Sequence, residues 1–214
     1  MKKERKQKIL SCFKVEEKLL ERGILIFSPL EFRQIFNVSR DSATFFINYN
    51  LKKGFFVKLK NGFYSLKHHF PSEFEIANRI YSPSYVSLEY AMMYHHIIPE
   101  TVYSVTSVTT KITREFVVNN VSYSYNKIKK VAFTGYIKQK LNKNIVLIAE
   151  REKAFIDYLY FVSLGKKAIY DRINVSDLKK KKLLYYAELF EKNSLIKLLN
   201  DTYDKSRRNK EIIY

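Results

Sequence analysis

Residues 28–66 read SPLEFRQIFNVSRDSATFFINYNLKKGFFVKLKNGFYSL, and they contain two helix starts followed by a hairpin signal. Ser28 is placed to cap the first helix, and Glu31 completes a capping box. The proline between them suits the first helical position. Phe27 and Phe32 flank the cap at the two positions of a hydrophobic staple. This part of the stretch predicts a helix that begins directly after Ser28.

A second helix is predicted to start eleven residues after the first. Ser39 is placed as its N-cap, and Gly54 is the residue type favoured just past a helix end. Residues 37–39 leave room for only a short turn between the two helices. The stretch therefore predicts two helices joined by a tight turn.

A β-hairpin is predicted immediately after these helices. Asn61-Gly62 is a favoured sequence for a two-residue type I′ turn, in which both residues have positive φ. In the register that this turn sets, Leu59 opposes Tyr64, and successive side chains alternate between the two faces. One face is expected to hold Val57, Leu59, Tyr64 and Leu66, and the other Lys58, Lys60, Phe63 and Ser65. The hairpin would thus present a basic wing.

The second helix has an apolar side and a polar side when its residues are spaced at 100°. The inward arc is expected to hold Ala43, Phe46, Ile47, Asn50 and Leu51. A helix that follows a tight turn and exposes short polar and basic side chains is typical of a major-groove reader. The predicted DNA-binding residues are Arg40, Asp41, Thr44, Phe45, Asn48, Lys52, Lys58 and Lys60. The alternative is a winged helix that makes only protein contacts.

The chain is strongly basic, with a formal net charge of +18 and a pI of about 9.7. Residues 1–68 hold 15 Lys and Arg against 6 Asp and Glu, so half of the excess charge lies in the first third. This is the segment with the predicted helices and wing. A basic surface on that segment indicates a polyanionic partner, with nucleic acid preferred over a membrane surface.

The sequence predicts an α+β protein of two domains. The first, residues 1–68, would be an N-terminal winged helix-turn-helix, with a helix over 3–22 and a short third strand at 24–27. The second, residues 72–214, would be a mixed α+β domain that ends in a helical region from about residue 170.

The second domain is predicted to begin with helices and to continue with strands. Ser72 and Ser87 are placed to cap helices over 72–81 and 88–97. Strands are expected where apolar and hydroxylated residues alternate, from Val102 and from Phe116, with a turn at Asn119-Asn120. A strand at 145–149, a helix at 151–164, and two helices at about 176–191 and 194–203 follow.

The single cysteine, Cys12, lies on the apolar side of the first helix and is expected to be a buried thiol. With one cysteine no disulfide framework forms within the chain, which indicates a reducing compartment. No stretch approaches 18 uninterrupted apolar residues, so neither a signal peptide nor a membrane span is predicted. A cytoplasmic location without membrane association is expected.

Catalytic and metal-binding patterns are weak in this chain. His95 and His96 are adjacent, so on a helix they point about 100° apart and do not form a metal pair. Glu150 and Glu152 follow a strand, but Lys153 is not two residues from Glu150, as a nuclease cluster of the Asp…Glu-x-Lys kind requires. The phosphate-binding and nucleophile motifs of common enzyme families are absent. We therefore expect no enzyme, cofactor or metal, and a nucleic-acid-processing enzyme remains a minor alternative.

Several motifs resemble the AbiEi antitoxins of bacterial type IV abortive-infection systems. The most specific are PSYVSLEYAMMYHHIIPE at 83–100 and YSVTSVTT at 103–110. The remainder are REF at 114–116, YSY at 123–125, IAE at 148–150 and KAFIDYLY at 153–160. The resemblance covers about residues 5–165 and maps no catalytic motif onto the chain.

The resemblance implies a winged-helix repressor that binds inverted repeats in double-stranded DNA upstream of its own operon. It also implies a C-terminal domain that counteracts a nucleotidyltransferase toxin, typically without a stable complex. Two alternatives remain open: an antitoxin that binds its toxin directly, and a plain winged-helix transcriptional regulator.

Overall fold

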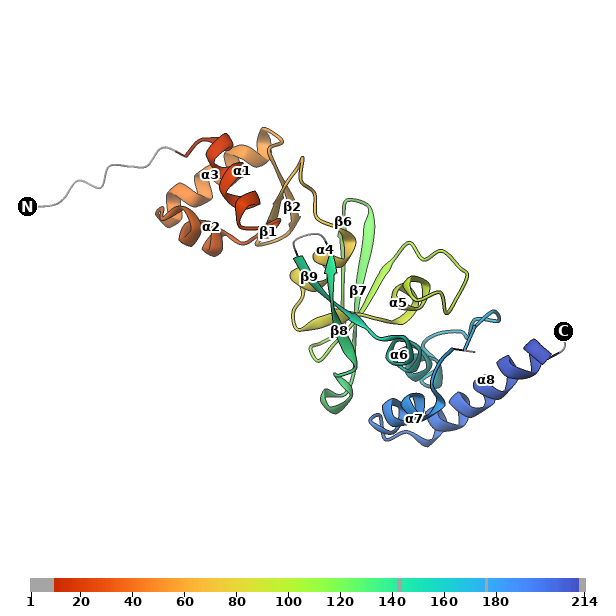
Figure 1. The fold of residues 1–214 in the computed structure, drawn as a ribbon. Coiled ribbons are helices and arrows are strands. Elements are labelled where there is room, and N and C mark those ends of the chain that lie inside the picture. The colour runs from red at the N-terminus through yellow and green to blue at the C-terminus, as the bar shows by residue number, and fades with distance from the viewer. Residues whose placement is uncertain (1–9, 142–143, 176, 212–214) are drawn as a thin grey trace, which may run out of the picture. The chain divides into compact units, whose positions relative to one another are not determined.

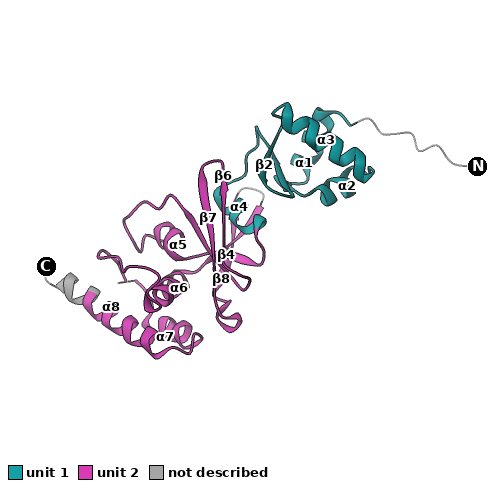
Figure 2. Ribbon diagram, turned by 180° about the vertical axis from the view of Figure 1, so that it is seen from behind, with its two compact units in different colours: residues 1–80 teal, residues 81–214 magenta. Residues whose placement is uncertain are grey.

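The computed structural model describes residues 10–141, 144–175 and 177–211, with side chains described up to Lys205. The fold is mixed α+β, as the sequence predicts. The chain divides into two compact units, residues 1–80 and residues 81–214 (Figure 2). Each unit has its own sheet.

The first unit combines helices with a three-stranded antiparallel sheet in the order β1-β3-β2. Its elements are α1 (Cys12–Glu21), β1 (Ile26–Phe27), α2 (Pro29–Phe36), α3 (Arg40–Lys52), β2 (Phe56–Lys60), β3 (Phe63–Leu66) and α4 (Glu73–Ile80). The strand β1 adds to the hairpin as the predicted third strand. Of the helix predicted over 3–22, residues 3–9 lie outside the described part, and α1 begins at Cys12.

The predicted helix starts are confirmed. Ser28 and Glu31 form the capping box at the start of α2, and the Phe27 and Phe32 rings lie 5.5 Å apart as a staple. The Ser39 hydroxyl accepts a hydrogen bond of 3.1 Å from a backbone N–H in the first turn of α3. Local side-chain chemistry therefore positions both helices and the turn between them.

The hairpin pairs Lys60 with Phe63 beside the turn, as the predicted two-residue turn requires, but the predicted register is wrong from Leu59 back to Phe56. Of the two turn residues only Gly62 has a positive φ, 82°, so the turn is not type I′. The pairing shifts between Lys58 and Lys60, and Lys58 opposes Tyr64. Because a turn of another type does not match the strand twist, a bulge at this place accommodates it. The bulge also lets Phe56 and Leu59, three residues apart, both be buried.

The core of the first unit lies between α1, α2, α3 and the sheet. The inward arc of α3 is as predicted, because Ala43, Ile47 and Asn50 are buried and Phe46 and Leu51 pack against the core. The buried members of the core are Val15, Leu19, Phe27, Phe32, Ile35, Phe36, Ala43, Ile47, Phe56 and Leu66.

The helix α4 groups with the first unit, whereas the sequence placed the domain boundary between residues 68 and 72. Ser72 caps this helix as predicted, through reciprocal hydrogen bonds with Glu75. From α4, Arg79 pairs with Glu31 on α2, and its guanidinium lies 5.6 Å from the Phe63 ring centroid. These long-range contacts, which periodicity does not reveal, attach α4 to the hairpin and to α2.

The second unit is built around a six-stranded sheet in the order β6-β7-β5-β4-β9-β8. The pairs β4–β9 and β5–β7 are parallel, and the others are antiparallel. Its strands are β4 (Ser84–Val86), β5 (Val105–Thr109), β6 (Arg114–Val118), β7 (Val121–Lys127), β8 (Tyr136–Leu141) and β9 (Asn144–Ala149). Its helices are α5 (Leu88–Tyr94), the 3-10 helix η1 (Lys130–Ala132), α6 (Arg151–Ser163), α7 (Lys180–Glu188) and α8 (Asn193–Glu211).

The helices of the second unit form successive layers. The helices α5 and α6 lie side by side on one face of the sheet, and α7 and α8 pack against α6 (Figure 1). Consequently α6 is covered nearly all round, with Glu152 to Leu159 all buried. A helix in this position must pair any charge that it carries.

The predictions for the second unit are correct in most elements and differ from the structure in one cap, two strands and several bounds. The helix α5 ends at Tyr94, β5 begins at Val105 and α7 begins at Lys180, each inside its predicted range, and residue 176 lies outside the described part. The turn at Asn119 and Asn120 is confirmed, with φ of 48° and 64°. Ser87 precedes α5 but makes no capping hydrogen bond, because the Tyr90 N–H in the first turn donates to the Thr106 hydroxyl at 3.0 Å; the Ser87 hydroxyl itself donates to the buried Asp157. The strands β4 and β8 were not predicted, because β4 is short and β8 is a polar edge strand without alternation.

Candidate functional site

The outer face of α3 and the hairpin strand β2 carry the residues predicted to contact DNA. Lys60 is half-buried, with its Nζ 5.2 Å from the Phe63 ring centroid. The remaining predicted residues are all exposed: Arg40, Asp41, Thr44, Phe45, Asn48, Lys52 and Lys58. The corrected register therefore leaves Lys58 as the more accessible of the two hairpin lysines.

A buried amide holds α3 against α1. The Asn50 side chain is 3% exposed, and its Nδ2 donates to the Phe46 carbonyl oxygen at 2.9 Å. Its Oδ1 accepts a hydrogen bond from the Cys12 thiol at 3.1 Å. The expectation of a buried thiol is therefore corrected in two ways: Cys12 is half-buried, and its thiol has a polar partner. The sequence placed Asn50 on the inward arc but did not indicate this contact, because the partner lies on another helix.

One row of side chains along the outer face of α3 is polar and basic. Arg40, Thr44, Asn48 and Lys52 follow one another at four-residue spacing, so they form a single row along the helix. Asp41 is the acid of this face, and it lies in the first turn, where a carboxylate interacts favourably with the helix dipole. The row offers hydrogen-bond donors over three turns together with positive charge at both ends.

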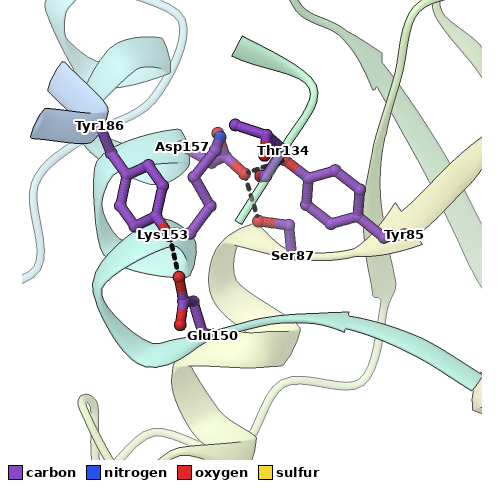
Figure 3. A network of polar contacts seen from close by, with 7 residues as sticks. All are labelled: Tyr85, Ser87, Thr134, Glu150, Lys153, Asp157 and Tyr186. Carbon is purple, nitrogen blue, oxygen red and sulfur yellow. Dashed lines mark hydrogen bonds and ion pairs between the residues drawn. The ribbon is translucent and has the colours of Figure 1, made fainter. Parts of the chain in front are cut away.

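The second unit contains a buried polar network that the sequence did not predict. Lys153 and Asp157, one turn apart on α6, form an ion pair in which both side chains have no solvent exposure (Figure 3). Asp157 Oδ2 accepts hydrogen bonds from the Ser87 hydroxyl at 2.8 Å and the Tyr85 hydroxyl at 3.0 Å. The network therefore joins α6 to β4 and the start of α5.

Burial dominates the electrostatics of this network. It lowers the pKa of Lys153 below 10.5, although the neighbouring Asp157 carboxylate acts to raise it. Burial likewise raises the pKa of Asp157 above 3.8, against the lowering effect of Lys153, Ser87 and Tyr85. The pKa of Tyr85 is also raised, by burial and by the adjacent carboxylate. The tyrosine therefore stays protonated and donates its hydrogen bond to Asp157.

Glu150 and Glu152, which do not have the spacing of a nuclease cluster, connect α6 to α7. Glu150 accepts a hydrogen bond from the Tyr186 hydroxyl (Figure 3) and another from the Lys182 ammonium group. Glu152 accepts one from the backbone N–H of Lys179 at 3.2 Å. Gly135 lies against this cluster, since a Cβ there would come within 2.8 Å of the Tyr186 ring. The carboxylate oxygens of Glu150 and Glu152 are therefore used in contacts within the protein.

The two adjacent histidines also differ in their surroundings. His95 Nε2 lies 2.7 Å from the Ala149 carbonyl oxygen, and burial lowers the pKa of this histidine below 6.5. His96 is exposed. In the described part of the chain, no group of three His, Cys, Asp or Glu residues is arranged to hold a metal ion.

No protein-family model matches this chain, and no curated protein shows significant similarity to it. Within the described residues, no helix has both the length and the apolar character needed to cross a bilayer.

Proposed function

We propose that this protein is a DNA-binding antitoxin that represses its own operon by binding inverted repeats in the upstream double-stranded DNA. The observation that carries the DNA-binding part is the exposed polar and basic row on α3, a helix that follows a tight turn and precedes a basic hairpin. This order of elements supports a winged helix-turn-helix, a motif in which the second helix of the turn enters the major groove.

Within that proposal the residues divide by chemistry. Asn48 has the amide group that pairs with adenine in the major groove, and Arg40 has the guanidinium group that pairs with guanine. Lys58, exposed on the hairpin, supplies charge for phosphate contacts, which fix the position of the protein without reading sequence. Specificity is thus assigned to α3 and sequence-independent affinity to the hairpin.

The antitoxin part of the proposal rests on the resemblance to AbiEi antitoxins alone. In it, the second unit acts without enzymatic activity and counteracts a nucleotidyltransferase toxin encoded by the neighbouring gene. The same first unit fits a plain winged-helix regulator, and an antitoxin that contacts its toxin directly is the further alternative. Val117, exposed on the edge strand β6, and Ile112, exposed just before that strand, favour a protein contact by the second unit.

Binding of the full chain to fluorescent duplexes of the upstream region tests the DNA-binding part. We expect affinity to exceed that for a scrambled duplex and to fall as salt concentration rises, because counterions are released from the phosphates. Asn48→Ala should reduce the preference for the upstream duplex. Ser194→Ala, which alters an exposed side chain of α8, serves as the control. Salt-independent binding, or no binding, would overturn the proposal.

Co-expression with the product of the neighbouring gene tests the antitoxin part. We expect growth to be restored by the full chain, and the two proteins not to co-purify. Stoichiometric co-purification would replace this mechanism with direct toxin binding. Specific DNA binding without any effect on growth would leave a plain regulator.

A further inference from the structure

Two aromatic side chains on α3 are exposed although they are large and apolar. Phe45 is 72% exposed and Tyr49 is 52% exposed. Their rings stack at a centroid distance of 6.1 Å and an interplanar angle of 17°, and the Lys53 Nζ lies 5.7 Å from the Tyr49 ring. We call Phe45 and Tyr49 the aromatic ridge. Stacking on Tyr49 restricts the Phe45 ring, so the ridge presents a preformed apolar surface.

The aromatic ridge adjoins the polar row. Phe45 lies three residues before Asn48, and residues at this spacing are neighbours on a helix surface. Phe45 also follows Thr44 directly and lies in the first half of α3. Any molecule that approaches the Asn48 amide therefore also meets the Phe45 ring.

The charges around the aromatic ridge favour a nucleic acid over a protein as its partner. Arg40 and Lys52 are exposed on the same helix, Lys53 is exposed at its C-cap, and Lys58 is exposed on the adjoining hairpin. The centre of a protein–protein interface is depleted in charged residues, whereas a DNA-binding surface is rich in positive charge. A polyanion that binds this basic face would contact the exposed rings of the aromatic ridge with an apolar group of its own.

Among the four bases, the 5-methyl group of thymine is the apolar group displayed in the major groove of duplex DNA. We propose that Phe45, supported by Tyr49, contacts thymine methyl groups in the bound DNA, so that the protein distinguishes thymine from uracil. This inference rests on the proposed DNA-binding function and adds a substrate feature to it. The polar row reads hydrogen-bonding groups, and the aromatic ridge reads methyl groups beside them.

Duplexes in which single thymines are replaced by deoxyuridine test the inference, because this change removes only the methyl group. With the full chain, we expect replacement at the contacted positions to weaken binding about fourfold for each methyl group lost, as for one buried carbon group. Phe45→Ala should weaken binding to the thymine duplex and abolish the difference between the two duplexes. Phe45→Leu, which keeps an apolar side chain, should retain most of the difference in affinity between the two duplexes.

Phe13 provides the matched control. It is 73% exposed on α1, nearly the same as Phe45, so Phe13→Ala removes an equally exposed ring elsewhere in the first unit. This variant should keep the thymine preference of the unaltered protein. Circular dichroism on each variant confirms that the helices are retained.

The outcomes distinguish a failure of the Phe45 contact from a failure of DNA binding itself. If neither duplex binds, the proposed DNA-binding function fails. If both bind equally at every position, or if Phe45→Ala keeps the preference for thymine, DNA binding stands and the contact by Phe45 is overturned.

Discussion

Lys153 and Asp157 form an ion pair from which solvent is fully excluded, one helical turn apart on α6. The Ser87 and Tyr85 hydroxyls donate to the same carboxylate, so four polar groups satisfy one another inside an apolar layer. A buried pair of this kind contributes little net stability, but loss of one partner is costly because the other charge stays buried.

We therefore expect Asp157→Ala to destabilise the second unit strongly, by about 3–5 kcal/mol. The double variant Lys153→Met with Asp157→Leu should cost much less, because it removes both charges and keeps the volume. Urea unfolding followed by circular dichroism measures both. A double variant that is no more stable than Asp157→Ala alone would contradict this account.

Gly135 is predicted to be intolerant of a side chain. Its φ is +72°, and a Cβ would lie 2.8 Å from the Tyr186 ring and 2.9 Å from the Lys153 Cγ. Gly135→Ala should cost about 2–4 kcal/mol, since backbone strain and overpacking act together. Gly165→Ala is the control, because its φ is +68° but no atom lies within 4 Å of its Cβ. If thermal unfolding shows that the two variants lose equal stability, crowding at Gly135 is unimportant.

The start of α2 should weaken in acid. Burial acts to raise the pKa of Glu31, but hydrogen bonds from Ser28 and the charge of Arg79 outweigh it, so the pKa lies below 4.5. A carboxylate with a depressed pKa contributes stability that is present above its unfolded pKa and is lost as pH falls through the folded pKa. The protection factors of amides in α2, which correct for the slower chemical exchange in acid, should fall below about pH 4.5.

Glu31→Gln should remove most of this acid dependence while leaving α2 less protected at neutral pH. Glu17→Gln, at an exposed carboxylate of α1, is the control and should keep the dependence. If the exchange of α2 is equally sensitive to acid in Glu31→Gln, another group controls it.

The hairpin lysine is expected to act through charge alone. Lys58→Ala should weaken binding to upstream and scrambled duplexes alike and lower the slope of log affinity against log salt by about one. Lys181→Ala, which removes an exposed lysine of α7, should leave both affinity and slope unchanged. A selective loss of affinity for the upstream duplex would instead assign a base contact to Lys58.

Features encoded by neighbouring residues could be predicted from the sequence. The caps at Ser28, Ser39 and Ser72 involve side chains that reach only three residues along the chain. The turn at Asn119 and Asn120 needs only two residues that tolerate positive φ. The exposed row on α3 follows from the helical period once the helix is located.

Features that depend on distant partners could not be predicted. The Asn61-Gly62 pair was a good signal for a turn, but the turn type and the register shift at Leu59 depend on which side chains the core accepts. Ser87 has the right position to be a cap, yet the Tyr90 N–H bonds to Thr106 instead, and the Ser87 hydroxyl donates to Asp157, 70 residues away. Neither competing partner is visible in the local pattern.

The sequence by itself determined where the helices of the first unit start and which face of α3 is polar, because caps and periodicity act within a few residues. Tertiary structure alone decided the hairpin register, the attachment of α4 to the first unit and the burial of Lys153 with Asp157. These features depend on contacts between segments far apart in the chain, and packing selects among local alternatives of similar energy.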